Sequence, residues 1–335
     1  MFISVVVAVR NEARHIAKCI ESLVNQDYDD YEIIVVDGMS EDGTYEILKE
    51  MQKKYDFKLL RNEKRNAAAG RNIGIKKAKG DVVAFIDGDA AASRDWLLRI
   101  KEAMSKNEVA GVGGPDMLPD NAPPIARIIG YVMTSPLARG GRLNPSTQHT
   151  LMEKERYVGH IPTCNLAIKK EIFYYVGTFD ESFVKGQDLE LNYRITKAGY
   201  KLLYSPSIRV VHHRKERISL FARQIYKWAK AKVAIIKKHG IDGFISHIYL
   251  WPLYAILGFM ALFLLSLLFN TMQSFLSLLF LGGVVYFTTI IFESARLMLK
   301  FGDRKLFLYS LLLLPIVHIA YACGVMVALI KRKIW

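Results

Sequence analysis

The stretch Gly80-Asp81-Val82-Val83-Ala84-Phe85-Ile86-Asp87-Gly88-Asp89-Ala90 decides how the rest of the chain is interpreted. Its apolar run predicts a strand buried on both faces, and this strand ends in two carboxylates separated by one glycine. Because residues i and i+2 of an extended chain point the same way, Asp87 and Asp89 can converge on one cation. Paired hard oxygens suit Mg²⁺ or Mn²⁺. A lone Asp-x-Asp is more often a solvated turn, so the neighbouring sequence has to decide.

Strand and helix patterns alternate through the first hundred residues. Strands are expected at residues 3–9, 31–37, 57–60 and 109–113, besides the opening one, with helices at 12–25, 42–54, 67–78 and 95–105. This βαβ order predicts an α/β fold with a mostly parallel sheet and helices on both faces.

Polar residues also follow the first two expected strands, in Ala8–Glu12 and at Asp37. Open α/β sheets bind their ligands at this carboxyl edge, and an acid after the second strand commonly bonds a nucleotide's ribose or base. No Gly-x-Gly-x-x-Gly or Walker-type loop follows a strand, which argues against a dinucleotide-dependent dehydrogenase.

Charge and hydrophobicity are unevenly distributed along the 335 residues. The net charge is +14, and from Arg209 to Lys238 ten Lys or Arg residues stand against one acid, Glu216. A basic stretch directly before apolar segments indicates a membrane surface rather than a nucleic-acid partner. The three scattered cysteines, without metal-ligand spacing, are typical of a reduced cytoplasmic environment.

The expected domains are residues 1–214, a basic amphipathic helix at 215–240, and a transmembrane part at 246–335. The helix has the character of one lying in a membrane interface, although packing on the soluble domain remains an alternative. Between residues 115 and 160, prolines and Gly140-Gly141 predict a lid with one short helix at Ile125–Met133.

Three apolar segments, at residues 248–269, 275–292 and 306–330, are each long enough to cross the hydrocarbon of a membrane. Basic Arg296–Lys305 and the uncharged turn Asn270–Gln273 place the soluble domain in the cytoplasm, as part of a multi-pass cell-membrane protein. Three spans would put Lys331-Arg332-Lys333 outside, where basic residues are disfavoured. The sequence leaves open whether that tail is tolerated or one segment is re-entrant. Within the third segment, His318 is expected to be hydrogen-bonded between helices.

Six short motifs occur in an order and at a spacing that are typical of one known family. They are Ala8–Glu12, Val36–Thr44, Gly70–Gly74, Asp87–Asp89, Thr163–Ile168 with Val176–Glu181, and Gly186–Leu191. Over about residues 1–230 the chain resembles family 2 inverting glycosyltransferases, which have the nucleotide-sugar-binding GT-A fold.

The resemblance implies a role for each matching residue. Ala8, Arg10 and Glu12 would line the nucleotide pocket, with Asp37 on the base or ribose and Arg71 on the sugar or phosphate side. Asp87 and Asp89 would hold a divalent metal, Mn²⁺ or Mg²⁺, on the donor diphosphate. A metal-binding histidine is expected at His212 or His213, with His212 favoured.

Asp188 would be the general base that takes a proton from the acceptor hydroxyl. The family usually has Glu-Asp at this point, whereas this chain has Gln187-Asp188, which removes a like charge that would raise the pKa of the base.

Gln224-Ile225-Tyr226-Lys227-Trp228 resembles the Gln-x-x-Arg-Trp motif of membrane-bound polysaccharide synthases, with Lys in place of Arg. Gln224, Lys227 and Trp228 would then contact the substrates, with Lys227 near the diphosphate and Trp228 against the acceptor sugar. Lysine lacks the bidentate fork of arginine, so its contact with phosphate would be looser. An equally weighted alternative is that Trp228 only anchors the helix in the membrane interface.

The sequence therefore predicts a membrane-bound inverting glycosyltransferase that moves a sugar from a UDP- or GDP-sugar to a lipid-linked saccharide. The alternatives are a polyprenyl- or dolichyl-phosphate sugar synthase, a processive polysaccharide synthase, and a scaffold or transporter subunit that has lost the chemistry. Because a phosphate acceptor has little need of a base, Asp188 favours a hydroxyl acceptor.

Overall fold

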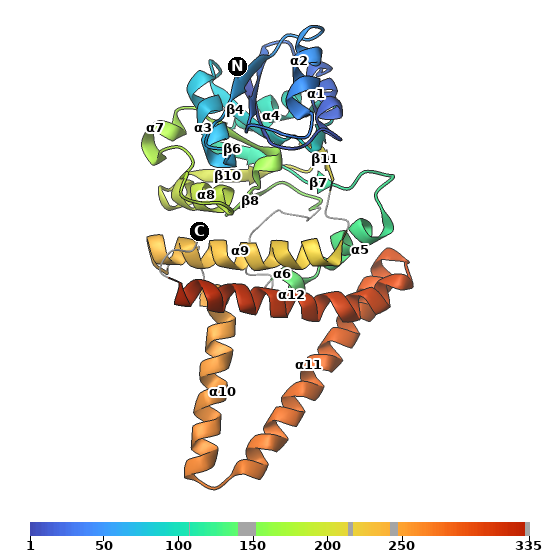
Figure 1. Ribbon diagram of the computed structural model, residues 1–335, viewed down its shortest axis with the longest axis vertical. Coiled ribbons are helices and arrows are strands. Elements are labelled where there is room, and N and C mark those ends of the chain that lie inside the picture. The colour runs from blue at the N-terminus through green and yellow to red at the C-terminus, as the bar shows by residue number, and fades with distance from the viewer. Residues whose placement is uncertain (107, 140–151, 214–216, 242–246, 332–335) are drawn as a thin grey trace. The chain divides into compact units, whose positions relative to one another are not determined.

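The computed structural model describes residues 1–106, 108–139, 152–213, 217–241 and 247–331 (Figure 1). Contacts divide the chain into two compact units, the first made of residues 1–122 and 145–214 and the second of residues 123–144 and 215–334. The part of the expected lid at residues 140–151 and the end of the basic tail lie outside the described residues.

The first unit is built on an eight-stranded sheet in the order β3-β2-β1-β4-β9-β6-β10-β8. The strands are β1 (Ile3–Val9), β2 (Tyr31–Asp37), β3 (Lys58–Arg61), β4 (Val82–Asp87), β6 (Val109–Gly113), β8 (Arg156–Val158), β9 (Leu166–Lys169) and β10 (Lys201–Tyr204). Strands β3, β2, β1 and β4 are mutually parallel, as are β6 and β10, whereas β9 and β8 run antiparallel to their neighbours.

Helices cover both faces of this sheet, because alternate residues of its strands point to opposite sides. Ile3, Val5 and Val7 of β1 pack with α1 (Ile16–Val24), α2 (Thr44–Gln52) and α4 (Trp96–Met104). Val6 points the other way, to the side of α3 (Ala67–Lys77), α7 (Ile172–Val176) and α8 (Gln187–Lys197). The predicted α/β fold with helices on both faces is confirmed.

A second, three-stranded sheet lies at the carboxyl edge of the first. It has the order β5-β11-β7, formed by β5 (Ala90–Ala92), β11 (Val210–His212) and β7 (Asp116–Met117). Strand β11 pairs antiparallel with β5 and parallel with β7. This small sheet brings residues from around 90, 116 and 212 together.

The second unit is helical. It contains α5 (Pro124–Val132), α6 (Pro136–Arg139), α9 (Ile218–His239), the 3₁₀ turn η2 (His247–Leu250), α10 (Trp251–Leu268), α11 (Met272–Phe301) and α12 (Lys305–Ile330). The short helix expected in the lid is α5, and by its contacts it belongs to this unit.

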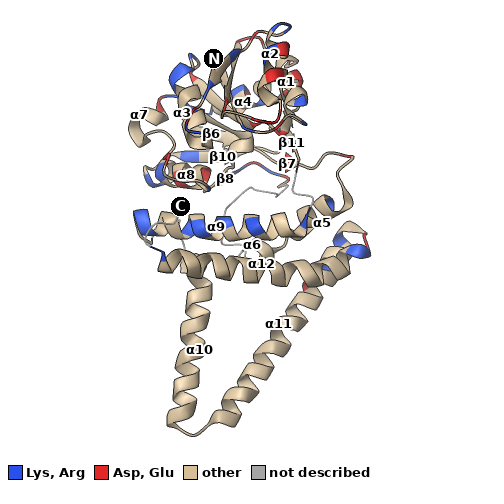
Figure 2. Ribbon diagram, viewed as in Figure 1, with Lys and Arg blue, Asp and Glu red and all other residues tan. Residues whose placement is uncertain are grey.

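Helices α10, α11 and α12 are each long and apolar enough to cross a membrane, so the prediction of three C-terminal apolar helices is confirmed. In Figure 2, Lys and Arg are frequent on α9 and nearly absent from α10. His318 of α12 is hydrogen-bonded between helices as expected, with Nδ1 3.0 Å from the Tyr286 hydroxyl and Nε2 3.1 Å from the Leu137 carbonyl oxygen.

Candidate functional site

The carboxyl ends of three neighbouring parallel strands bring the first predicted site residues together. In the register of the sheet, Ala8 of β1 lies opposite Asp87 of β4, and Val9 lies opposite Asp37 of β2. Parallel strands end at the same edge of the sheet. The residues predicted to bind the nucleotide and those predicted to bind the metal therefore lie at one edge.

The loops after β1 and β2 hold one another in place through hydrogen bonds. Asn11 adopts a left-handed φ of 56°, and its N–H donates to the Ser40 hydroxyl at 2.9 Å. The N–H of Glu12 donates to the Thr44 hydroxyl at 2.8 Å. Arg10, between these anchored positions and β1, is exposed and therefore accessible to a ligand.

Asp37 is completely buried at the end of β2. Its Oδ2 accepts a hydrogen bond from the Ser40 N–H at 3.2 Å and lies 3.4 Å from Nη1 of Arg61. Its Oδ1 has no hydrogen-bond partner among the described residues. A buried carboxylate oxygen without such a partner can accept a hydrogen bond from an N–H or O–H group of a ligand.

Asp87, Asp89 and His212 form a group whose ligand atoms all lie within 4.8 Å of one another. His212 reaches the two carboxylates because β11 pairs with β5, which sets His212 opposite Ala90. Its Nε2 lies 3.2 Å from Oδ1 of Asp89. Two carboxylates and one imidazole are donors that Mn²⁺ accepts well.

The two adjacent histidines have different surroundings. Although burial lowers the pKa of His212, the charge of Asp89 and the nearby carboxylate of Asp116 outweigh burial and raise the pKa well above its usual value. The His213 ring instead stacks on His15, with ring centroids 4.3 Å apart. Of the pair that the sequence left open, His212 is the one placed beside Asp89.

Two further residues approach His212 that sequence reasoning missed. Oδ2 of Asp116 lies 3.7 Å from Nδ1 of His212, and Cys164 forms a second possible ligand group with these two residues. Burial raises the pKa of the Cys164 thiol to about 12. Asp116 follows β6 at the carboxyl edge of the sheet. The expectation that acids following a strand lie at the ligand-binding edge, which identified Asp37, could therefore have identified Asp116 as well.

Asn165 holds the strands that carry Asp116 and His212. It is fully buried, and its Nδ2 donates to the carbonyl oxygens of Pro115 at 3.2 Å and of Ile208 at 2.7 Å. Gly114 permits this close approach, since a Cβ there would lie 2.0 Å from the Ile208 carbonyl oxygen.

Arg71 connects Asp87, a predicted metal ligand, with Gln187, the residue that precedes the predicted base Asp188. This arginine of α3 is only 8% exposed; its Nη2 donates to Oδ1 of Asp87 and its Nη1 to Oε1 of Gln187, both at 3.0 Å. Gln187 is buried, and its Nε2 donates to the Phe183 carbonyl at 2.7 Å. Gln187 is thus a neutral acceptor for Arg71, at the position where the resemblance leads one to expect a glutamate.

Asp188 lies in the first turn of α8 beside a buried histidine. Nε2 of His160 is 3.4 Å from Oδ2 of Asp188, and the Leu189 N–H donates to Oδ1 at 2.9 Å. Burial raises the pKa of Asp188, but hydrogen bonding with His160 and the charges of His160 and Arg71 outweigh it and lower the pKa to about 2. Asp188 is therefore ionised at neutral pH. No sequence signal pointed to His160, which lies in the proline-rich stretch.

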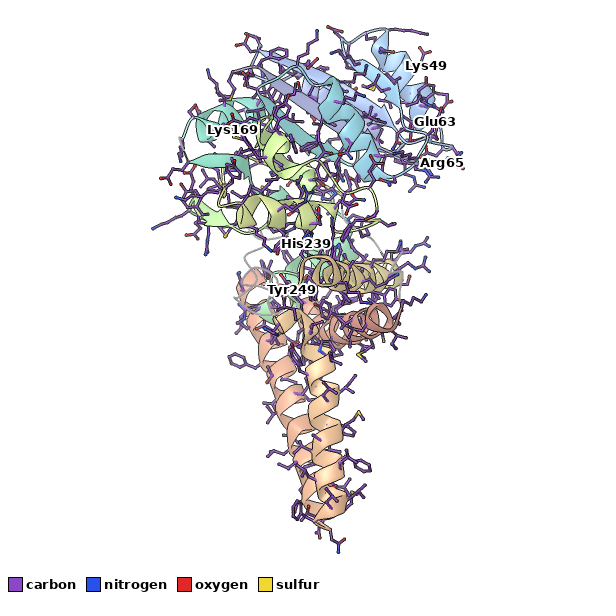
Figure 3. The ribbon with its side chains drawn as sticks, turned by 90° about the vertical axis from the view of Figure 1, so that its left-hand side faces the viewer. Lys49, Glu63, Arg65, Lys169, His239 and Tyr249 are labelled. Atoms are coloured by element: carbon purple, nitrogen blue, oxygen red, sulfur yellow. The ribbon has the colours of Figure 1, made fainter. Side chains whose placement is uncertain are left out.

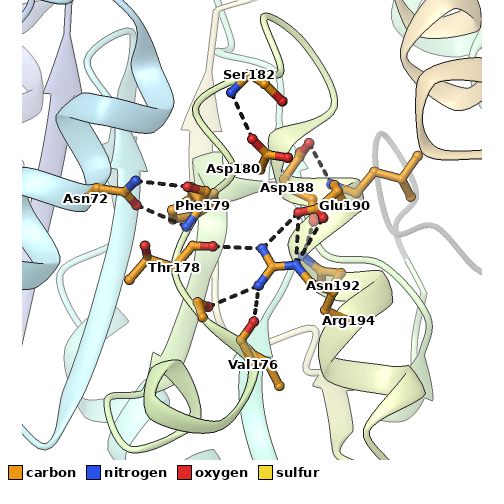
Figure 4. Close-up of polar contacts among 12 residues, drawn as sticks. Asn72, Val176, Thr178, Phe179, Asp180, Ser182, Asp188, Glu190, Asn192 and Arg194 are labelled. Atoms are coloured by element: carbon orange, nitrogen blue, oxygen red, sulfur yellow. Dashed lines mark hydrogen bonds and ion pairs between the residues drawn. The ribbon is translucent and has the colours of Figure 1, made fainter. Parts of the chain in front are cut away.

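The start of α8 is fixed by polar contacts shown in Figure 4. Arg194 pairs with Glu190 at 2.8 Å and donates to the carbonyl oxygens of Val176 and Thr178. On the opposite side, Asn72 of α3 both donates to the Phe179 carbonyl and accepts from its N–H. These contacts tie the loop before α8 to two helices and so hold Asp188 in position.

The remaining predicted residues, Gln224, Lys227 and Trp228, lie on α9 in the second unit. The first unit alone thus combines an oxygen and nitrogen donor set for a divalent metal with an ionised carboxylate able to accept a proton. Such a pair suits transfer of a group away from a phosphate leaving group.

Known proteins share both the sequence and the fold. Residues 4–176 match Glycosyl transferase family 2. The chain is 30% identical to the dolichyl N-acetyl-alpha-D-glucosaminyl phosphate 3-beta-D-2,3-diacetamido-2,3-dideoxy-beta-D-glucuronosyltransferase of Methanococcus voltae, over 98% of each chain. It is 27% identical to glycosyltransferase AglE of Haloferax volcanii, over 77% of this chain and 81% of that one.

Among solved structures, the mannosyltransferase PcManGT from Pyrobaculum calidifontis, in complex with GDP-Man and Mn²⁺, superposes with a TM-score of 0.62 at 18% identity. The match covers 97% of this chain and 86% of that chain, and it confirms the predicted GT-A fold. The chain is a glycosyltransferase and belongs to Glycosyl transferase family 2.

Proposed function

We propose that this protein is a metal-dependent inverting glycosyltransferase, which moves a sugar from a nucleoside-diphosphate sugar to a hydroxyl group of a lipid-linked saccharide at the cytoplasmic face of a membrane. The observation that carries the proposal is the Arg71 link between two chemically distinct groups. One is the donor set around Asp87, and the other is the ionised Asp188 next to Gln187.

Asp87, Asp89 and His212 fit a divalent cation by donor chemistry and by the spacing of their ligand atoms. A cation held there would neutralise the charge that develops on the departing nucleoside diphosphate. Asp116, on the other ring nitrogen of His212, would orient the imidazole so that Nε2 faces the cation. Mn²⁺ is favoured over Mg²⁺ because one of the three donors is an imidazole.

Asp188 would act as the general base. It would accept the proton of the acceptor hydroxyl while that oxygen attacks the anomeric carbon from the face opposite the diphosphate. This single displacement inverts the configuration at that carbon. A phosphate acceptor is already an anion and needs no base, so an ionised carboxylate at Asp188 favours a hydroxyl acceptor over the synthase alternative.

The nucleotide would occupy the edge formed by β1 and β2. The unpartnered Oδ1 of Asp37 would accept a hydrogen bond from the base or ribose, and Ala8, Arg10 and Glu12 would form the neighbouring wall. PcManGT was solved with a GDP-sugar, and we keep both GDP- and UDP-sugars as candidates.

The lipid-linked acceptor is supported by the relative from Methanococcus voltae, whose name specifies a dolichyl phosphate-linked sugar, and by the apolar helices of the second unit. Gln224, Lys227 and Trp228 lie on basic α9, where they would meet the acceptor's headgroup. The excess of basic residues beside the apolar segments supports a cytoplasmic site.

Donor binding tests the first part of the proposal. The melting temperature of the purified protein is measured with Mn²⁺ and each of a panel of UDP- and GDP-sugars. A cognate donor stabilises the folded state by mass action, so at least one sugar nucleotide should raise the melting temperature only when Mn²⁺ is present. No increase with any donor would contradict the proposed site.

A further inference from the structure

Helices α9 and α12 lie side by side along most of their length in the second unit (Figure 1). Phe221 and Ile225 of α9 share one apolar cluster with Leu313 and Val317 of α12. Further along, Gly324 of α12 approaches α9 closely, and a Cβ there would lie 2.5 Å from the Tyr226 carbonyl oxygen.

The C-terminal ends of the two helices also contact each other. Nζ of Lys237, in the last turn of α9, donates to the carbonyl oxygens of Ala328 at 2.8 Å and Lys331 at 3.0 Å, which end α12. Viewed from the side, both helices are seen nearly along their axes, next to His239 and Tyr249, whereas α10 and α11 run lengthwise below them (Figure 3). The two helices therefore share one direction, which α10 and α11 do not.

Helix α9 cannot cross a membrane, because it is basic over its whole length. Its cationic residues are Arg223, Lys227, Lys230, Lys232, Lys237 and Lys238. The first and last of these are separated by about 22 Å along the helix axis, and each cation near the bilayer centre costs about 2.5–3.5 kcal/mol. An apolar helix packed along α9 in the same direction cannot cross either.

The other partners of α12 lead to the same conclusion. Ile128, Ile129 and Val132 of α5 pack into the cluster that contains Leu313. The middle of α12 is bound to α6 through His318 and the Leu137 carbonyl. A crossing α12 would therefore have to carry α5, α6 and α9 into the bilayer with it.

The face of α12 that is not packed on protein is strongly apolar. Leu308 is 70% exposed, Ile319 63% and Ile330 81%, although they span most of the helix. Exposed leucine and isoleucine side chains spaced along one helix are suited to the acyl chains just below the headgroups. Next to them, basic α9 supplies cations for anionic headgroups.

We propose that α12 does not cross the membrane but lies with α9 in the membrane–water boundary, and that α10 and α11 are the described helices that span it. The basic residues around Arg304 and Lys331 then lie on the same side as the strand-bearing unit, and the uncharged turn after α10 lies on the other. The conflict that three spans create at the basic tail disappears. The partner of the α9–α12 surface is the lipid bilayer, whatever reaction the protein catalyses.

The depth of α12 in a bilayer tests the proposal directly. Cys323, exposed on α12, is replaced by serine, while buried Cys19 and Cys164 remain. Single cysteines are then introduced as Leu308→Cys, Ile319→Cys and Ile330→Cys, spin-labelled, and measured in lipid vesicles by accessibility to oxygen and to a water-soluble relaxation agent. The three exposed positions should report similar shallow depths. A spanning helix would instead place 319 near the bilayer centre, with 308 and 330 about 33 Å apart along the axis at opposite surfaces.

The side on which the last described residue of α12 lies gives a second, independent measurement. In sealed membranes, Lys331→Cys and Asp56→Cys should react with a membrane-impermeant maleimide from the same side, and Thr271→Cys from the other. Lys331→Cys reacting together with Thr271→Cys would overturn the proposal.

Discussion

Nε2 of His160 lies 3.4 Å from Oδ2 of Asp188, and this histidine counteracts the burial that would otherwise raise the pKa of the carboxyl group. The charge of Arg71 also acts on Asp188, and hydrogen bonds to Asp87 and Gln187 hold this arginine nearby. The predicted base is thus kept ionised by a residue that the sequence did not indicate.

Replacing His160 should change the pH dependence of transfer. The pKa of Asp188, about 2 in the native protein, lies below its ordinary value, so the base remains ionised until the pH falls toward 2. In His160→Phe the opposing hydrogen bond and charge are lost, burial dominates, and the pKa of Asp188 rises. The acidic limb of kcat/KM should therefore move to higher pH.

The matched control is His160→Gln, which keeps an N–H donor toward Asp188 and should move the limb less. Identical acidic limbs in the native protein and in His160→Phe would show that His160 does not act on the base.

Loss of one carboxylate should weaken metal binding. Asp89→Asn keeps the side chain's shape but removes the charge that faces His212, so we expect Mn²⁺ affinity to fall at least about tenfold. Titration calorimetry without substrate measures this independently of activity. Asp56→Asn, a change of an exposed aspartate, is the control and should bind Mn²⁺ normally. Unchanged affinity in Asp89→Asn would exclude Asp89 as a ligand.

Restoring the family's glutamate should destabilise this chain. Gln187 donates through Nε2 to the Phe183 carbonyl, and a carboxylate at that position cannot donate. We expect Gln187→Glu to lower the free energy of unfolding by about 1–3 kcal/mol, the usual cost of an unsatisfied buried group. Thermal unfolding in detergent measures the change. A melting temperature equal to or above the native one would mean that the added charge near Arg71 compensates for the lost bond.

Close contact between α9 and α12 requires glycine at position 324. In Gly324→Ala the new Cβ would lie 2.5 Å from a backbone carbonyl oxygen, so the helices must separate and the melting temperature should fall. Gly258→Ala on α10 is the matched control, because nothing lies within 4 Å of its Cβ and alanine favours a helix by about 1 kcal/mol. Equal melting temperatures for the two variants would contradict the packing of α12 on α9.

Much of the first unit could be predicted because its signals are local. Strands β1 and β2 have the bounds that the apolar runs indicate. Asp37 and Asp87 end strands at one sheet edge, and Asp89 follows in the turn after β4. The position of β9 between β4 and β6 was not predictable, because antiparallel pairing across eighty residues leaves no periodic signature in either segment. His160 was missed for the same reason, since only tertiary structure brings it to Asp188.

The second unit shows a different limit of sequence reasoning. Hydropathy identifies α10, α11 and α12 as apolar but does not distinguish a helix that crosses lipid from one that lies along a basic neighbour. That distinction depends on packing partners, here Phe221 of α9 and Leu137 of α6.

The most direct test of the account is transfer itself. Purified protein in lipid vesicles is given Mn²⁺, the nucleotide sugar that stabilises it, and a membrane lipid extract, and both nucleoside diphosphate and lipid-linked product are measured. The account predicts that both form together and that Asp188→Asn reduces their rate about 10²–10⁴-fold while donor binding is retained. No nucleoside diphosphate and no lipid-linked sugar from the native protein, or near-native turnover in Asp188→Asn, would contradict it.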